Sequence, residues 1–519
     1  MSLEPRDLEQ LRGAGISAAE AERQLALLQS PPPHTRLARA CRVGDGILRL
    51  PERAHAGLVA RAERGAAEGR LALFVPASGA ASRMFESLQR SLDEDCALEA
   101  ITLQAGAGDR AAGDTLRFLR HWEELAMADE LQSDLARRGV ARAAWATDAR
   151  PLLEALLRPA GLGYAERPKA LIPFHRTGDG VRTALEEHLV EAAAYAADAA
   201  GRCRVHFTVS REHLAGVEAL LAARRAELET SLRTSFDLGF SHQERSTDTL
   251  AIDLSGRPFR VADGSLLLRP GGHGALLANL QARARAGADV LVIKNIDNVA
   301  PDRSKDLTVH WQKLLVGHLL SLRDRLFEIL ARLGATEIGR EDVALAIDFA
   351  EQELGYRPTS LVRATPLEER RSILRARLDR PLRVCAVVPN DGQPGGGPFW
   401  VEDPHGEDRP QIVESAQVDP DSESQAEIWA SSTHFNPVDL VCSLRDADGR
   451  PYDLQRYRDP EAVFIAAKSH GGRHLRALEH PGLWNGAMAH WNTVFVEAPA
   501  ATFTPVKTVL DLLRPEHRA

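Results

Sequence analysis

Short apolar runs alternate with amphipathic stretches along much of this 519-residue chain. The clearest apolar runs are residues 71–75 (LALFV), 204–209 (RVHFTV), 290–293 (VLVI) and 383–388 (RVCAVV). Runs of this length, bounded by Gly, Pro or Asn, predict buried strands. Helical periodicity fills segments between them, such as 184–200 and 306–333. Strands that alternate with helices predict an α/β fold in which helices cover a largely parallel sheet.

The same pattern predicts four parts. Residues 1–70 are predicted to be a helical region, and residues 71–333 an α/β core. Residues from about 85 to 165 show no convincing strand, which predicts a helical insertion within that core. Residues 334–380 continue as helix, and residues 381–519 return to a mixed pattern that we expect to complete the core.

Composition excludes several classes of protein. The net charge of −9 gives no support to an electrostatic nucleic-acid binder. The five cysteines are scattered and odd in number, without a Cys-x-x-Cys pair, which argues against a disulfide framework and a zinc site. The start of the chain has no apolar core of signal-peptide length, and no run approaches the ~18 apolar residues of a membrane helix. We therefore expect a cytoplasmic protein with neither a nucleic-acid nor a membrane partner.

The stretch 71–84, LALFVPASGAASRM, is the strongest candidate for chemistry. Its predicted strand ends in a turn of small residues, whose uncovered backbone N–H groups an anion can approach. Arg83 then supplies a planar cation where a polyphosphate would lie. This pattern predicts a nucleoside-triphosphate loop made of Ser78, Gly79, Ala80, Ala81 and Ser82. An ordinary strand-to-helix turn, with small residues for packing, is the alternative interpretation.

Two further glycine clusters are candidate ligand contacts. Gly271, Gly272, His273 and Gly274 precede a predicted helix, where a ligand can touch the backbone. A plain glycine turn with a surface histidine explains the same residues. Gly395–Gly397 belong to NDGQPGGGPFW, which predicts a mobile loop.

Two aspartates are candidate metal ligands. Asp297 follows the apolar run 290–293, and ligands of open α/β sheets lie beyond the carboxyl ends of strands. Asp439, in FNPVD, is a candidate for a second metal carboxylate. A helix or turn cap is the alternative for Asp297, because Asp and Asn favour both positions, and a turn residue beside a strand is the alternative for Asp439.

The order of these motifs carries a family resemblance. The motifs are residues 76–84 (PASGAASRM), 168–169 (PK), 270–274 (PGGHG), 295–298 (NIDN), and 503–507 (FTPVK) with 511–513 (DLL). Together they resemble the sugar-nucleotidyltransferases, above all the UDP-sugar pyrophosphorylase branch, over roughly residues 71–513. As a whole, the chain most resembles a bacterial group catalogued as a domain of unknown function.

This resemblance implies a three-layer, Rossmann-like nucleotidyltransferase fold (GT-A-like) with a mixed sheet, a helical N-terminal extension and helical insertions. It implies Mg²⁺-dependent joining of a nucleoside triphosphate, with UTP favoured, to a sugar 1-phosphate, with release of pyrophosphate. Arg83, Lys169 and Lys507 would then neutralise the phosphates, and Asp297, with Asp439 as a second candidate, would hold Mg²⁺. Residues 271–274 would meet the base, and Gly395–Gly397 with Asn436 the sugar.

The chain also departs from the family pattern. Ser78 and Ala81 replace two glycines, and about 80 residues separate Arg83 from Lys169, where the family has a short loop. The alternative function is therefore a non-catalytic or regulatory protein that binds a nucleotide or nucleotide sugar. Retention of Arg83, Lys169, Asp297 and Lys507 together favours the enzyme, and the lost glycines favour the binder.

Overall fold

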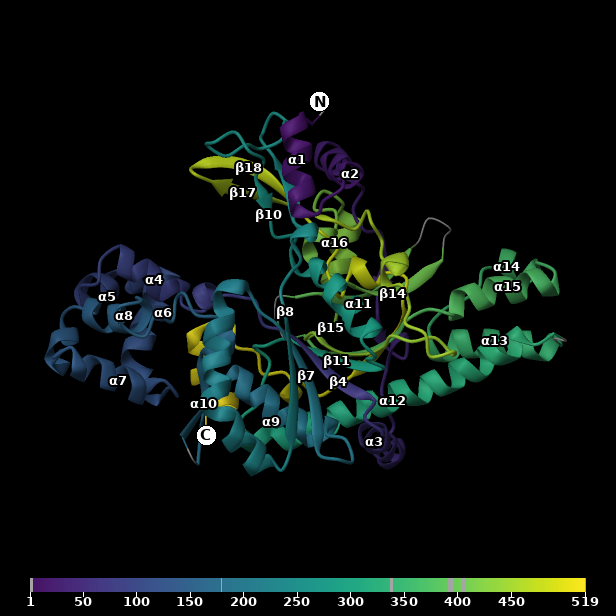
Figure 1. The fold of residues 1–519 in the computed structure, drawn as a ribbon, viewed down its shortest axis with the longest axis horizontal. Helices are drawn as coiled ribbons and strands as arrows, with labels where there is room; N and C mark the ends of the chain where they lie inside the picture. Colours follow the sequence, from purple (N-terminus) through teal and green to yellow (C-terminus); the bar gives the residue numbers. More distant parts are fainter. Residues whose placement is uncertain are drawn as a thin grey trace.

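A computed structural model describes residues 3–178, 180–336, 339–390, 392, 395–402 and 407–518. Its centre is a ten-stranded sheet (Figure 1). In one half, four strands run parallel in the spatial order β11-β4-β7-β8: β4 (Leu71–Pro76), β7 (Arg202–Thr208), β8 (Ser235–Ser241) and β11 (Val290–Lys294). The predicted apolar runs therefore form neighbouring strands of one sheet.

The other half of the sheet is mixed. Its strands are β16 (Asp439–Ser443), β12 (Leu382–Pro389), β19 (Asn492–Glu497), β3 (Gly46–Leu48) and β2 (Arg42–Val43), with β15 (His434–Phe435) pairing β12. β16 runs antiparallel between β11 and β12, whereas β12 and β19 are parallel. The sheet is thus mixed, as predicted, and residues after 381 complete it.

The order of strands reverses next to β4. From β4 the chain proceeds to β7 and β8 on one side, and then returns to place β11 on the other side of β4. In open α/β sheets, ligands bind in the crevice at such a switch point, outside the carboxyl ends of the strands. Pro76 and Lys294, which end β4 and β11, therefore mark where a site is expected.

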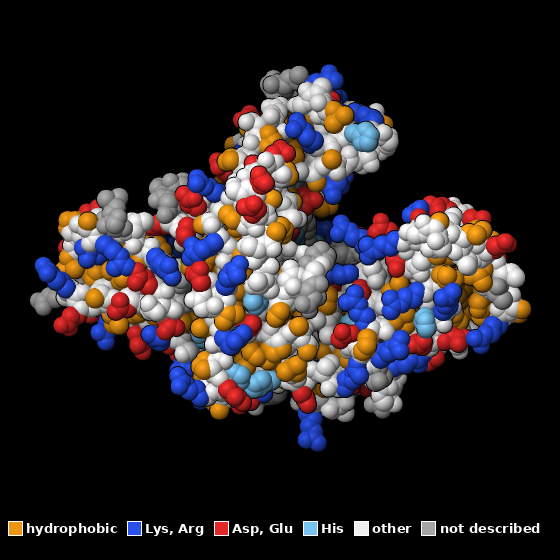
Figure 2. Space-filling view, turned by 180° about the vertical axis from the view of Figure 1, so that it is seen from behind, with side chains coloured by type: hydrophobic (Ala, Val, Ile, Leu, Met, Phe, Trp, Pro, Cys, Tyr) orange, Lys and Arg blue, Asp and Glu red, His pale blue; other side chains and the backbone are white. Residues whose placement is uncertain are grey.

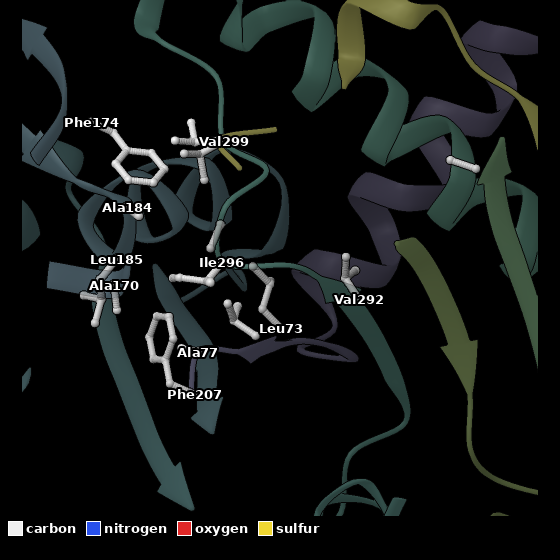
Figure 3. Close-up of a cluster of buried hydrophobic side chains, with 14 of the residues drawn as sticks. Leu73, Ala77, Ala170, Phe174, Ala184, Leu185, Phe207, Val292, Ile296 and Val299 are labelled. Carbon is white, nitrogen blue, oxygen red and sulfur yellow. The ribbon is translucent and has the colours of Figure 1, made fainter. Parts of the chain in front are cut away.

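Helices cover both faces of the sheet, which gives the predicted three layers. α3 (Glu52–Ala67), α9 (Ala184–Ala196) and α12 (Asp302–Gly334) pack on the face that carries Leu73 and Val292 (Figure 3). α11 (Leu277–Arg285) packs on the opposite face, against Phe74 and Leu291. Successive strand residues point to opposite faces, so these fully buried strands need apolar residues at nearly every position.

The predicted helical insertion is confirmed. It folds into α4 (Glu86–Asp93), α5 (Leu98–Gly106), α6 (Arg110–His121), α7 (Ala128–Arg137) and α8 (Arg150–Leu157). These helices form the lobe at the left of Figure 1. Their buried residues, including Phe118 and Trp122, are continuous with the main core. The predicted helical segment 334–380 contains α13 (Arg340–Glu353), α14 (Ser360–Ala364) and α15 (Leu367–Leu378).

The prediction that residues 1–70 are helical is wrong for one segment. α1 (Pro5–Ala14), α2 (Ala18–Gln29) and α3 are helices, but β1 (Leu37–Ala40), β2 and β3 lie between them. β1 pairs with β13 (Gly397–Glu402), which also pairs with β14 (Asp408–Val413), and β3 pairs with β19. β1 and β3 are specified by partners more than 300 residues later, and β2 pairs with β3, so the local sequence does not show these short strands.

A second, four-stranded sheet projects from the core at the top of Figure 1. Its strands are β9 (Thr249–Ile252), β10 (Leu268–Arg269), β17 (Phe464–His470) and β18 (Arg473–Glu479). Leu11 and Leu25, from α1 and α2, pack with Leu250 and Leu478 of this sheet.

The surface carries both signs of charge, as the composition leads us to expect. Figure 2 shows Lys and Arg intermingled with Asp and Glu on the face that it presents. Within the described ranges, no helix is both long and apolar enough to cross a membrane.

Candidate functional site at the carboxyl edge of the sheet

Two lysines contact one carboxylate at the switch point of the sheet. Lys169 Nζ lies 2.8 Å from Asp297 Oδ2, and Lys507 Nζ lies 3.0 Å from the same oxygen. The side chains of Asp297 and Lys169 are 9% and 12% exposed, whereas that of Lys507 is 55% exposed. Three residues from distant parts of the sequence therefore form one charged cluster beyond β11.

Backbone contacts hold this cluster together. Val506 N–H donates to the Asp297 carbonyl at 2.9 Å, and Thr504 N–H donates to Asn298 Oδ1 at 3.1 Å. Lys169 Nζ also donates to the Val506 carbonyl at 2.9 Å. The segment 503–507 is thus docked on the segment 295–298, which fixes Lys507 beside Asp297.

The loop after β4 lies next to Lys169. Ala81 N–H donates to the Arg167 carbonyl at 2.9 Å, and Lys169 N–H donates to the Gly79 carbonyl at 3.3 Å. Ser78, Gly79 and Ala80 are exposed, and their N–H groups have no hydrogen-bond acceptor within the described ranges. Three consecutive open donors beside a lysine form a cradle that suits an anion.

The rest of this loop divides into a buried and an exposed part. Ala81 is buried, and it begins the short 3₁₀ turn Ala81–Arg83. Ser82 and Arg83 are exposed. The Ala81 N–H group donates to the Arg167 carbonyl, so it is not one of the open donors of the loop.

The charge of Asp297 is stabilised inside the protein. Burial raises the pKa of this carboxyl, but Lys507 and Lys169 outweigh burial, so its pKa lies below the ordinary value. Asp297 is therefore an anion at neutral pH, and both lysines have a carboxylate partner before any ligand binds.

α9 supports the turn that presents Asp297. His188 Nε2 lies 3.2 Å from the Asn295 carbonyl and 3.3 Å from the Ile296 carbonyl. Burial lowers the pKa of His188 to about 4, so the imidazole is neutral and donates from Nε2. Beneath this turn, Lys294 Nζ forms a buried ion pair of 2.5 Å with Glu191.

Asp439 lies in a different environment from Asp297. It pairs in register with Lys294 at the start of β16, and its side chain accepts a hydrogen bond from Gln312 of α12. Burial raises the pKa of Asp439 to about 6, and its Oδ1 has no partner within the described ranges. Asp439 therefore faces the helices under the sheet, and we do not include it in the metal site proposed below.

The donor set constrains any metal. Across the described ranges, no group of three His, Cys, Asp or Glu residues could hold a metal ion. Asp297 can supply one ligand to Mg²⁺, and other oxygens must complete the coordination. Mg²⁺ that binds together with a nucleotide takes one or two carboxylates plus phosphate oxygens and water, so a single Asp297 fits such an ion.

Packing explains much of the glycine pattern in residues 271–274. Gly272 has φ +74°, and a Cβ at Gly274 would overlap the Pro481 carbonyl oxygen. His273 stacks on Trp484 at 4.2 Å between ring centroids, and its Nδ1 accepts from Leu483 N–H at 3.1 Å. Burial lowers the pKa of His273 to about 4. The predicted contact with the base stays a prediction.

Asn436 serves the fold in this structure. Its Nδ2 donates to the Ala386 carbonyl at 2.7 Å, and its Oδ1 accepts from Val438 N–H at 3.1 Å. Its own N–H donates to the Gly396 carbonyl at 2.7 Å, so Asn436 holds the glycine loop. Gly395 is exposed, whereas Gly396 and Gly397 are buried. The predicted mobility of this loop falls partly on residues 391 and 393–394, which lie outside the described residues.

Glu414 is a candidate site residue that the sequence interpretation missed. Its carboxylate lies 4.0 Å from His273 Nε2, and its Cγ lies 3.4 Å from where a Cβ on Gly396 would be. Burial raises the pKa of Glu414 above its ordinary value. The two glycine clusters thus converge on one carboxylate. Nothing in the local sequence distinguishes this residue from the other acidic residues.

Several solved structures of known proteins are similar to this chain. One is the UDP-N-acetylglucosamine pyrophosphorylase of Trypanosoma brucei, at 11% identity and a TM-score of 0.48, covering 98% of this chain and 79% of that one. Another is the UDP-glucose pyrophosphorylase of Leishmania major, at 13% identity and a TM-score of 0.44, covering 99% and 79%. A third is a structure from Entamoeba histolytica titled as a putative UDP-N-acetylglucosamine pyrophosphorylase, at 10% identity and a TM-score of 0.43, covering 88% and 80%.

No curated protein matches the chain. The family model described as "Domain of unknown function (DUF4301)" matches residues 4–518. Because this match spans nearly the whole sequence, the chain belongs to the DUF4301 family.

Proposed function

We propose that this protein is a Mg²⁺-dependent nucleotidyltransferase that joins a nucleoside triphosphate, with UTP favoured, to a sugar 1-phosphate and releases pyrophosphate. The observation that carries the proposal is the convergence of Lys169 and Lys507 on Asp297, beside the open loop at the switch point of the sheet. The order of the sequence motifs supports the same reaction.

The loop supports binding of the triphosphate. The open N–H groups of Ser78, Gly79 and Ala80 would donate to phosphate oxygens, and Gly79 leaves clear space above the backbone. Arg83 has no hydrogen-bond or ion-pair partner within the described ranges, so its guanidinium is available to a ligand. Arginine binds phosphate in a bidentate geometry, which suits the end of a triphosphate chain.

The chemistry needs no protein nucleophile. A phosphate oxygen of the sugar 1-phosphate attacks the α-phosphorus, a new P–O bond forms, and the bond from the α-phosphorus to the bridging oxygen breaks. The electron pair of that bond leaves with pyrophosphate. Catalysis of such a transfer rests on positioning and on neutralising charge in the transition state.

Each lysine then has a distinct task. Lys169 is nearly buried and fixed by Asp297 and the Val506 carbonyl, so it presents a positioned cation next to the loop. The backbone of Lys507 is docked beside Asp297, but its side chain is more than half exposed, so the ammonium group can turn from that carboxylate toward phosphates that arrive. A bound Mg²⁺ would supply further neutralisation of phosphate charge. Asp297 would hold the Mg²⁺ ion once phosphate oxygens replace its carboxylate as partners of the Lys169 and Lys507 ammonium groups.

The cluster around Glu414 supports recognition of a sugar. A carboxylate between two glycine loops, beside the stacked rings of His273 and Trp484, can accept hydrogen bonds from sugar hydroxyls. This placement would bring the predicted base contact and the predicted sugar contact into one continuous surface.

A screen for pyrophosphate release tests the proposal. The intact protein is incubated with Mg²⁺, each nucleoside triphosphate and a set of sugar 1-phosphates, and pyrophosphate is measured against reactions that lack the sugar phosphate. We expect release that requires both substrates and Mg²⁺. Tight nucleotide or nucleotide-sugar binding without release from any pair would instead support the non-catalytic binding protein.

A further inference from the structure

A short turn follows Lys507, and an aspartate of that turn bonds back to the lysine. η12 (Val509–Leu513) is a 3₁₀ turn, and Asp511 occupies its third position. Asp511 Oδ2 accepts from Lys507 N–H at 2.8 Å and from Thr508 N–H at 2.7 Å. Because the side chain of Asp511 is only 9% exposed, one nearly buried carboxylate oxygen holds two consecutive backbone donors.

A capping box explains the bond to Thr508 but not the bond to Lys507. In a capping box, the residue before a helix and the third residue of the helix exchange hydrogen bonds between side chain and backbone, which stabilises the first turn. Thr508 and Asp511 make this exchange. Lys507 precedes the box, so the turn can form without the bond from Lys507 N–H. The additional bond therefore fixes the lysine rather than the turn.

The segment before Lys507 is held by other partners. The N–H groups of Thr504 and Val506 donate to the segment 295–298. Within the described ranges, the Lys507 N–H group has no acceptor other than Asp511. Loss of the Asp511 carboxylate would therefore release the backbone of Lys507 while the preceding segment stays docked.

The two ends of Lys507 thus differ in freedom. Its backbone is fixed by Asp511, whereas its side chain is 55% exposed and its Nζ lies 3.0 Å from Asp297 Oδ2. A cation that must meet a transferring phosphate gains from a fixed backbone, because a displacement of about 1 Å can lower the rate about 100-fold.

We propose that Asp511 is a positioning residue for nucleotidyl transfer: by accepting the hydrogen bond from Lys507 N–H, it sets the point from which the lysine ammonium reaches the transferring phosphate. The inference rests on the proposed function, and Asp511 acts through Lys507 without touching the substrates. Its second oxygen, Oδ1, pairs with Arg514 Nη2 at 2.7 Å, and the Arg514 side chain is 56% exposed. The two oxygens therefore separate the contact with Lys507 from an ion pair on the surface.

Four variants of the full-length protein separate positioning from stability. Asp511→Ala removes the acceptor, whereas Asp511→Asn keeps an oxygen that can accept from both N–H groups. Asp511→Glu keeps a capping box, in which Glu is a usual third residue, but its longer side chain moves the carboxylate away from Lys507 N–H. Arg514→Ala is the matched control, because it removes the ion pair at Oδ1 and leaves the bonds at Oδ2.

Steady-state kinetics of pyrophosphate release, with thermal unfolding alongside, gives the main result. We expect kcat to fall at least ~10-fold in Asp511→Ala and to fall also in Asp511→Glu, with the KM for the nucleoside triphosphate within about twofold of wild type. Asp511→Asn should restore most of kcat, and Arg514→Ala should keep it. If Asp511→Ala does not fold, the comparison of Asp511→Glu with Asp511→Asn decides.

Hydrogen–deuterium exchange of the amides of residues 507 and 508 measures the same contact without turnover. We expect faster exchange in Asp511→Ala, and exchange at the wild-type rate in Asp511→Asn and Arg514→Ala. A kcat within about twofold of wild type in the folded Asp511→Ala and Asp511→Glu variants, or an equal loss of kcat in Arg514→Ala, would overturn the inference.

Failure of the proposed function would give a different result. A wild-type protein that releases no pyrophosphate from any substrate pair would remove that function. Faster exchange at residues 507 and 508 in Asp511→Ala would then still support Asp511 as the residue that fixes Lys507, whereas unchanged exchange would overturn this role as well.

Discussion

Lys507 Nζ lies 3.0 Å from Asp297 Oδ2, although 210 positions separate the two residues. The contact brings the end of the chain to the carboxyl end of β11, where Lys169 also bonds to the same carboxylate. The proposed site is therefore complete only when the C-terminal segment is docked on the segment that follows β11.

Replacing Lys507 should separate activity from folding. The Lys507 side chain is 55% exposed, so Lys507→Ala removes little packing. Because the ion pair between Lys507 and Asp297 is open to solvent on the lysine side, we expect it to contribute at most about 1 kcal/mol to the free energy of folding. Because the lysine would neutralise charge that grows in the transition state, we expect kcat to fall at least ~100-fold. Steady-state kinetics and thermal unfolding measure the two effects, and Lys468→Ala in β17 is the control. Wild-type kcat in Lys507→Ala would leave Lys507 with a docking role only.

Two glycines should respond differently to the same substitution. A Cβ at Gly79 has no neighbour within 4 Å, whereas a Cβ at Gly274 would overlap the Pro481 carbonyl oxygen. We expect Gly79→Ala to fold normally but to lose triphosphate affinity, because the added methyl group obstructs phosphate at the open N–H groups. Gly274→Ala should lower the unfolding temperature. Calorimetry and thermal unfolding of both variants check this, and normal triphosphate binding by Gly79→Ala would move the phosphates away from the loop.

The buried histidine pair near the C-terminus should make stability depend on pH. His517 Nδ1 lies 2.9 Å from His175 Nε2, and His175 Nδ1 lies 2.9 Å from Glu187, which also bonds Lys305. Burial, with positive charge from His175, Arg514 and Arg303, lowers the pKa of His517 to about 3. The folded protein therefore leaves His517 unprotonated in a range where the unfolded chain takes up a proton.

The sign of this effect follows from proton linkage. Between about pH 6.5 and pH 3 the unfolded chain binds more protons at this position, so the free energy of unfolding falls as the pH falls. At 1.36 kcal/mol per pKa unit, His517 alone accounts for about 2 kcal/mol between pH 6.5 and pH 5. Urea unfolding at both pH values should show this loss in the wild type and a smaller loss in His517→Gln. An equal loss in both proteins would contradict a neutral, buried His517.

The sequence predicted the parallel strands because burial on both faces leaves a local signal. β4 and β11 are almost uninterrupted apolar runs, and turn residues follow each of them. Asp297 could be placed because a carboxylate after such a strand lies at the carboxyl edge of the sheet. By contrast, β1 and β3 owe their conformation to pairing with β13 and β19, which no local pattern reveals.

Side-chain direction explains what could not be predicted about the site. Asp439 begins β16 opposite Lys294, but whether its carboxylate faces the crevice or the helices depends on the pleat of an antiparallel strand. Glu414 gains its position from contacts with Gly396 and His273, which are distant from each other in sequence. Such convergence requires the three-dimensional arrangement.

The most direct test of the account is ³¹P NMR of the reaction with the wild-type protein and with Asp297→Asn. Each reaction contains Mg²⁺, UTP and the sugar 1-phosphate that gives the most pyrophosphate in the release screen. Asp297→Asn keeps the shape of the side chain but leaves Lys169 and Lys507 without their anion, so we expect a free energy of unfolding lower by about 1–3 kcal/mol, measured alongside in urea. The account predicts equal amounts of a pyrophosphate diester product and free pyrophosphate with the wild type, and neither with the folded variant. A variant that makes both products at the wild-type rate would contradict the central role of Asp297.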